Sequence, residues 1–143
     1  MKTMLRTVVV LGVLVAGWMV CPRPTVAADG PSADKIFERR IYIANPGKLP
    51  ALHARFREHT CQLFKKHGIE LVGFWTPMDG EEAQNTLIYL VAFPNAEAQK
   101  KAWKAFQDDP EWKQAKAASE KDGVLVREMQ SKNLKATDYS PLR

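Results

Sequence analysis

Hydrophobic residues between positions 36 and 130 recur with two different periods. Alternation with a period of two is typical of a strand with one buried face, whereas a period near 3.6 is typical of an amphipathic helix. The two periods follow one another in the order strand, helix, strand, strand, helix, strand, which predicts a split βαβ fold. The predicted strands cover residues 36–44, 69–76, 86–93 and 124–130, and the predicted helices cover 48–67, 96–107 and, as a short addition, 110–118.

Turn and capping residues set the limits of these elements. Gly68 is a suitable C-terminal stop for the first helix, and Asn95 is a suitable N-cap for the second. Asp109 before Pro110 predicts a new helix, because aspartate caps helices well and proline is favoured at the first helical position. Gly73 lies inside the second strand and predicts a bulge or a close backbone approach.

Both faces of the predicted sheet carry large apolar residues. Right-handed crossovers place the two main helices on one face of a four-stranded antiparallel sheet, so the other face needs a different cover. A second copy of the chain, packed sheet against sheet, would provide it, and the sequence therefore predicts a homodimer that closes a two-chain barrel. By strand parity one face holds Leu71, Trp75, Leu87, Tyr89 and Phe93, and the other holds Val72, Phe74, Ile88 and Leu90.

Residues 1–28 have the features of a secretory signal peptide. Lys2 and Arg6 precede the uncharged apolar run 8–20, and small residues stand before the expected cleavage site. That run is shorter than the roughly 20 residues needed to span a bilayer, which disfavours an uncleaved membrane anchor. Cleavage is expected before Asp29, with Ala28 as the second choice. We therefore expect a periplasmic or secreted protein with a disordered leader, 29–35, and one domain, 36–143.

Charge and cysteine content narrow the function classes further. Removing 1–28 lowers the net charge from +5 to +2, and no basic cluster interleaved with aromatic residues is left to predict nucleic-acid binding. Cys61 would be the remaining cysteine, which leaves three alternatives open: a buried apolar side chain, a free thiol or an intermolecular disulfide. The three histidines lie on one predicted helix without the three- or four-residue spacing of a metal pair, so no metal site is predicted.

Six short motifs follow one another along the chain: Glu38-Arg39-Arg40-Ile41-Tyr42, Pro46-Gly47-Lys48, His67-Gly68-Ile69, Gly73-Phe74-Trp75, Asp109-Pro110-Glu111-Trp112 and Ser140-Pro141-Leu142. This ordered set resembles the NIPSNAP family. The resemblance covers essentially residues 37–142 and implies a dimeric α+β barrel of ferredoxin-like topology, in agreement with the pattern above. The family has no well-defined biochemical activity.

Three functional hypotheses follow. The first is an exported protein that binds a small apolar or aromatic ligand between sheet and helices, because the available residues combine apolar surface with a few polar groups. The second is an enzyme, either a cofactor-free monooxygenase or a haem-related enzyme, by analogy with other families of the same fold, with His59 as acid or base and Arg40 stabilising an anion. The third is a protein-interaction module without a ligand. The sequence identifies no cofactor, and the candidate ligand-binding residues are Arg40, Tyr42, His59, Trp75 and Tyr89.

Overall fold

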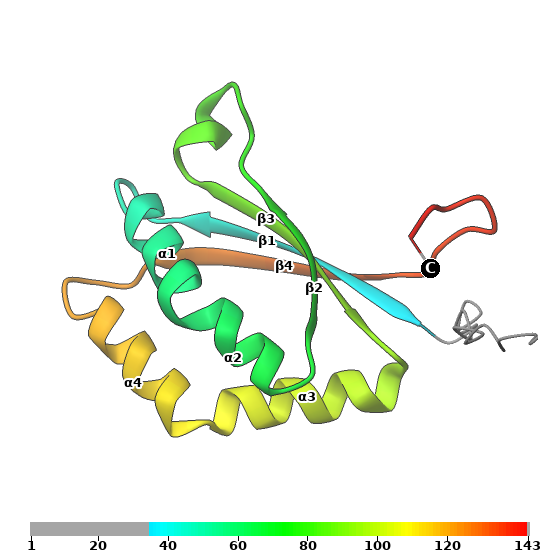
Figure 1. Ribbon diagram of the computed structural model, residues 1–143. Helices are drawn as coiled ribbons and strands as arrows, with labels where there is room; N and C mark the ends of the chain where they lie inside the picture. The colour runs from blue at the N-terminus through cyan, green and yellow to red at the C-terminus, as the bar shows by residue number, and fades with distance from the viewer. Residues whose placement is uncertain (1–34, 143) are drawn as a thin grey trace, which may run out of the picture.

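The computed structural model describes residues 35–142, so the predicted signal peptide and nearly all of the predicted leader lie outside the described residues. Four strands and four α-helices form two layers, a sheet and a helical layer on one of its faces (Figure 1). No helix within residues 35–142 has both the length and the apolar character that crossing a membrane requires. The elements are β1 Ile36–Ala44, α1 Leu49–Arg55, the π-helical turn η1 Phe56–Thr60, α2 Cys61–Lys66, β2 Glu70–Trp75, the 3₁₀ turn η2 Glu81–Gln84, β3 Thr86–Phe93, α3 Ala96–Asp108, α4 Pro110–Ser119 and β4 Val126–Leu134.

The sheet confirms the predicted topology. Its strand order is β2-β3-β1-β4, and every neighbouring pair is antiparallel. This is the ferredoxin-like arrangement, in which each βαβ half returns to the sheet with one strand between its own two. Helices α1 to α4 lie together below the sheet in Figure 1, so within residues 35–142 no α-helix covers the opposite face.

The first predicted helix contains an irregular turn that periodicity did not predict. The chain runs continuously from α1 through η1 into α2, and in η1 the backbone N–H of Cys61 donates to the carbonyl of Phe56, five residues back. The Thr60 hydroxyl also donates to the carbonyl of Arg55, at 3.2 Å. Such π-helical turns occur often at functional sites. This one leaves Arg55, Phe56 and Thr60 all buried.

A bulge in β2 changes which side chains face the helices. The register shifts between Leu71 and Gly73, as the glycine predicted. After the shift Phe74 lies opposite Tyr89 and faces the helices, whereas Trp75 lies opposite Ile88 on the outer face. The prediction that Trp75 shares a face with Tyr89 is therefore wrong, because simple alternation does not count the extra residue of a bulge. The Trp75 ring lies over Gly73, where an added Cβ would come within 2.5 Å of it.

The last strand starts two residues later than predicted and ends four residues later. β4 begins at Val126 and continues to Leu134, which lies opposite Phe37 near the start of β1. Its second half is polar and lacks the alternation that marks a strand in sequence. Backbone pairing along nearly all of β1 determines its length instead.

The hydrophobic core lies between the sheet and the helices and is rich in aromatic rings. Tyr89, at the centre of the inner face, is fully buried, stacks with Phe74 at 5.5 Å between ring centroids and contacts Phe56 and Phe64 from the helical layer. Large aromatic groups bury much apolar area each, so this cluster holds the helices against the sheet. Other buried members are Leu52, Leu63, Ile69, Leu87, Val91, Phe93 and Phe106.

Candidate functional site

Three polar side chains project from β1 into the space between the two layers. Glu38, Arg40 and Tyr42 are alternate residues of one strand and therefore lie on the same face. Arg40, in the middle of this row, lies opposite Tyr89 of β3 on one side and opposite Ser131 of β4 on the other. The row forms a polar layer within an otherwise apolar interior.

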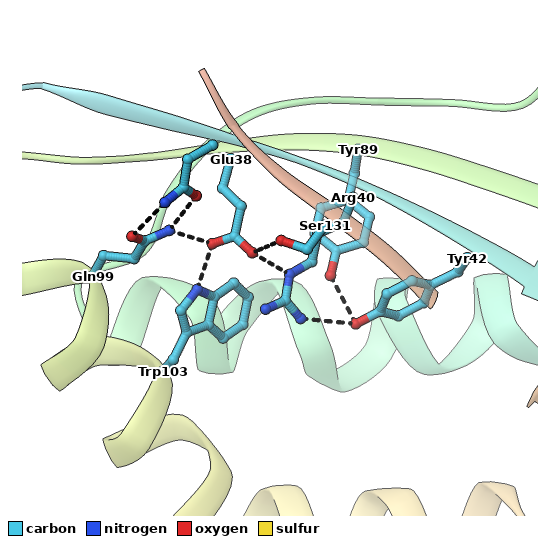
Figure 2. Close-up of polar contacts among 8 residues, drawn as sticks. Glu38, Arg40, Tyr42, Tyr89, Gln99, Trp103 and Ser131 are labelled. Atoms are coloured by element: carbon cyan, nitrogen blue, oxygen red, sulfur yellow. Dashed lines mark hydrogen bonds and ion pairs between the residues drawn. The ribbon is translucent and has the colours of Figure 1, made fainter. Parts of the chain in front are cut away.

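Glu38 is the centre of this layer (Figure 2). Its carboxylate is 2% exposed and accepts four hydrogen bonds, two on each oxygen. Oε1 accepts from Arg40 Nε at 2.7 Å and from Ser131 Oγ at 2.6 Å, and Oε2 accepts from Gln99 Nε2 at 2.7 Å and Trp103 Nε1 at 2.6 Å. Burial raises the pKa of Glu38, but the hydrogen bonds from Ser131, Arg40 and Trp103 outweigh it, so the pKa lies below its usual value. Glu38 is therefore ionised in the folded protein at neutral pH.

Arg40 is held on two sides. Its Cζ lies 3.8 Å from the centroid of the Trp103 ring, and its Nη1 donates to the Tyr42 hydroxyl at 3.3 Å. Burial lowers the pKa of Arg40, while Tyr89, Tyr42 and Glu38 raise it by a larger amount, so the group stays charged. The Arg40 charge is thus neutralised by a buried carboxylate and stacked on an indole.

The Tyr42 and Tyr89 hydroxyls form the far end of the layer. Their oxygens are 2.9 Å apart, and burial raises the pKa of Tyr89 well above its usual value, so this phenol is neutral. A hydroxyl has one proton to donate and two lone pairs that accept. When Tyr42 accepts from both Arg40 and Tyr89, its own proton is left to donate elsewhere.

A pocket of about 270 Å³ lies next to this hydroxyl pair, between the sheet and the helices. Tyr42 belongs to both the polar layer and the pocket wall. Most of the wall is apolar or aromatic, with a few charged groups, which is the usual composition of a small-molecule site. The lining residues are Tyr42, Arg55, Phe56, Thr60, Phe64, Phe106, Trp112, Lys116, Glu120, Val124, Val126 and Met129.

Arg55 is the functional candidate that sequence reasoning missed. It is the last residue of α1 and is 4% exposed. Its Nη1 donates to Glu120 Oε1 at 2.9 Å and to Ser119 Oγ at 3.3 Å, and its Cζ lies 5.2 Å from the Trp112 ring centroid. Its Nε is buried and has no hydrogen-bond partner among the described residues. The available sequence signal was weak, because an arginine at the edge of an apolar stripe usually reaches solvent.

The structure brings three of the five predicted ligand-binding residues together. Arg40, Tyr42 and Tyr89 meet in the polar layer. His59 is exposed on η1, and Trp75 lies on the outer face of the sheet, 54% exposed.

The other two histidines, His53 and His67, are not among the residues that line this pocket. His67 Nε2 lies 2.7 Å from Asp109 Oδ2, which Lys66 also contacts at 2.8 Å. Hydrogen bonds from Lys66 and His67 hold the pKa of Asp109 below its usual range. Asp109 also accepts from the backbone N–H of Glu111, so it caps α4 as predicted and ties the end of α2 to it. Burial lowers the pKa of His53.

Cys61 lies at the start of α2, is partly buried and forms no disulfide within residues 35–142, and burial raises the pKa of its thiol. No group of three or more His, Cys, Asp or Glu side chains within residues 35–142 is arranged to hold a metal ion.

Solved structures of low sequence identity share this fold. An uncharacterised NIPSNAP-like domain protein from Burkholderia xenovorans is 21% identical, with a TM-score of 0.67 over 76% of this chain and 90% of that chain. A NIPSNAP family protein of unknown function from Agrobacterium tumefaciens is 23% identical, with a TM-score of 0.67 over 78% and 96%. SnoaB, a cofactor-independent oxygenase from Streptomyces nogalater, is 13% identical, with a TM-score of 0.52 over 76% and 99%.

No curated protein matches the chain. The NIPSNAP family model matches residues 37–141, which is nearly the whole described region and includes every strand and helix after the first residue of β1. The match agrees with the motifs found in the sequence and with the fold of the solved relatives. The chain belongs to the NIPSNAP family.

Proposed function

We propose that the protein is an exported homodimer that binds a small apolar or aromatic molecule between the sheet and the helices. The observation that carries this proposal is the 270 Å³ pocket, because its wall combines aromatic rings with a few buried polar groups. The volume lies just below the usual range for drug-sized ligands, which favours a ligand of one or two rings.

The homodimer is supported by the outer face of the sheet. Among the described residues no α-helix covers this face in Figure 1. By strand register it carries a row of apolar side chains. Ile41, Ile88 and Leu90 are half-buried near its centre, and Trp75 is 54% exposed at its edge. Contiguous apolar surface of this kind is typical of an interaction site, and a second sheet is its natural cover.

A binding role has more support than catalysis. The described residues that line the pocket include no histidine, and the carboxylate among them, Glu120, is paired with Arg55. A reaction that needs a general base would therefore lack the usual groups. The likeness to an oxygenase is one of fold, and a shared fold does not carry an activity.

Export rests on the N-terminal pattern of charged, apolar and small residues. Processing is testable by intact-mass measurement of protein isolated from its own host. We expect a mature N-terminus at Asp29 or Ala28. A chain that keeps residues 1–28 would contradict this part of the proposal.

Native mass spectrometry of protein from the same source tests binding. We expect a homodimer that retains a small molecule. Met129→Trp should fill the pocket and abolish retention, since Met129 lines it from β4. Met78→Trp is the matched control, because Met78 is fully exposed outside the pocket. A ligand-free dimer, together with no binding in a fragment screen, would favour the interaction module. A retained haem would favour the enzymatic alternative.

A further inference from the structure

We propose that Arg55 anchors the carboxylate of the ligand, so that the pocket selects small aromatic carboxylic acids over their neutral analogues. This inference rests on the proposed binding function and adds the chemical class of the ligand. It concerns a residue on the helical side of the pocket, opposite the polar layer of β1.

The guanidinium of Arg55 has one edge that makes hydrogen bonds and one edge that makes none within residues 35–142. Both hydrogen bonds that it makes within residues 35–142 leave from Nη1, toward Glu120 and Ser119. Nε is buried with no partner there, although a buried donor almost always has one. Nε and Nη2 together form this unpaired edge, whose two parallel N–H groups fit the two oxygens of one carboxylate.

The position of this edge is fixed before any ligand arrives. Glu120 holds Arg55 from one side, and the Trp112 ring lies against the guanidinium, 5.2 Å from Cζ. The π-helical turn η1 begins directly after Arg55, whose side chain is buried. Because Nε is enclosed by protein atoms, a carboxylate reaches it only when a neighbouring side chain turns aside.

The other polar groups of the wall also suit a single negative charge. Arg55, Lys116 and Glu120 are its charged members, so their sum is one positive charge. Tyr42 adds a hydroxyl whose proton is available when it accepts from both Arg40 and Tyr89. A monoanion therefore balances the charge and meets donors from two sides of the pocket.

The apolar part of the wall determines the rest of the ligand. Phe56, Phe64, Phe106 and Trp112 contribute aromatic surface, which favours an aromatic body. A volume of about 270 Å³ accommodates one ring or two fused rings. The geometry points to a ligand such as a benzoate or naphthoate in size and charge.

The test compares 1-naphthoate with 1-naphthamide, which match in shape and differ in charge. NMR titrations of the full chain at pH 7.5 would give both affinities. The side-chain Nε–H signal of Arg55, assigned in the wild-type protein by triple-resonance NMR, reports directly on the proposed contact. We expect the acid to bind at least tenfold more tightly than the amide and to shift this signal, which the amide should leave in place.

A variant tests whether acid binding needs the paired N–H donors of Arg55 or only its positive charge. Arg55→Lys keeps the positive charge but loses the paired donors, so it should weaken acid binding at least tenfold and change amide binding less than twofold. Arg57→Lys is the matched control, because it makes the same substitution at an exposed position on η1 outside the lining of this pocket. It should change acid binding less than twofold. Circular dichroism checks that each variant is folded, and if Arg55→Lys is not, the wild-type comparison and the Nε–H shift still decide.

Each outcome has a distinct meaning. Equal affinity for acid and amide would overturn the assignment to Arg55 and leave the proposed binding function in place. An acid preference that survives Arg55→Lys would also overturn it, since charge alone would then be sufficient. Binding of neither probe at millimolar concentration would overturn both the assignment and the binding function.

Discussion

Replacing Glu38 by glutamine should lower the free energy of unfolding by about 3–5 kcal/mol, the usual cost of breaking one partner of a buried ion pair. The substitution keeps the size of the side chain but removes its charge. Arg40 then stays buried without a counter-ion, with only 13% of its side chain exposed. The amide NH₂ of glutamine also cannot accept, so two of the four donors around Glu38 lose their acceptor.

Urea unfolding followed by far-UV circular dichroism measures this change. All samples must have the same protein concentration, since a dimer links stability to concentration. The midpoint should fall while the slope stays constant, and the melting temperature should fall by about 12 °C or more, at about 4 °C per kcal/mol. Glu58→Gln, at an exposed position on η1, is the control and should change stability by less than about 0.5 kcal/mol. A loss below about 1 kcal/mol for Glu38→Gln would refute the reasoning, because it would mean that the network contributes little net energy.

The stability of the wild type and that of Glu38→Gln should also depend differently on pH. The folded protein lowers the pKa of Glu38 below its ordinary value of 4.5. A lowered carboxyl pKa contributes stability that is fully present above the unfolded pKa and is lost as the pH falls toward the folded one. The stability difference between wild type and Glu38→Gln should therefore be constant near neutral pH and narrow below about pH 4.5.

Three further predictions concern substitutions of single residues. Tyr42→Phe removes the acceptor of Arg40 Nη1 and Tyr89, so it should cost about 1–3 kcal/mol in urea unfolding, whereas Tyr139→Phe, at an exposed position, should be neutral. Asp109→Asn keeps a capping side chain but loses the charge that meets Lys66 and His67. Because the pKa of Asp109 is lowered, its deficit in melting temperature should be present at neutral pH and disappear in acid, and a deficit that persists there would contradict this. Ile88→Asp, on the outer face, should convert the proposed dimer to a monomer in light scattering, whereas Gln114→Asp, exposed on α4, should not; a wild type that is monomeric at high dilution would refute the dimer.

The sequence predicted β1 and β3 with their observed limits, because each combines a clear hydrophobic pattern with turn residues at its ends. It also located the helix that starts at Pro110, where Asp109 caps the first turn as expected. Such local signals act over a few residues and need no knowledge of the rest of the fold.

Features that depend on distant partners were not predictable in this way. Gly73 indicated a bulge, but the resulting change of face for Trp75 depends on which residue of β3 it meets. The extent of β4 depends on pairing with β1 and on bonds such as that from Ser131 to Glu38. The burial of Arg55 depends on a π-helical turn, which a search at 3.6 residues per turn does not detect.

The hydrogen bonding of the buried polar groups indicates which of them stabilise the fold and which are suited to bind a ligand. Around Glu38 each carboxylate oxygen accepts two hydrogen bonds, and the Arg40 charge is neutralised within the strand that carries it. A ligand that took over one of those bonds would have to break it first, so the polar layer is best suited to fixing the position of Tyr42 at the pocket wall. Across the pocket, Arg55 keeps an unpaired donor in the interior at an energetic cost. A ligand gains the most binding free energy where the protein has left a hydrogen-bond donor unpaired. We therefore expect Arg55, on the helical side of the pocket, to determine which ligand binds. Tyr42 would donate the second hydrogen bond from the sheet side.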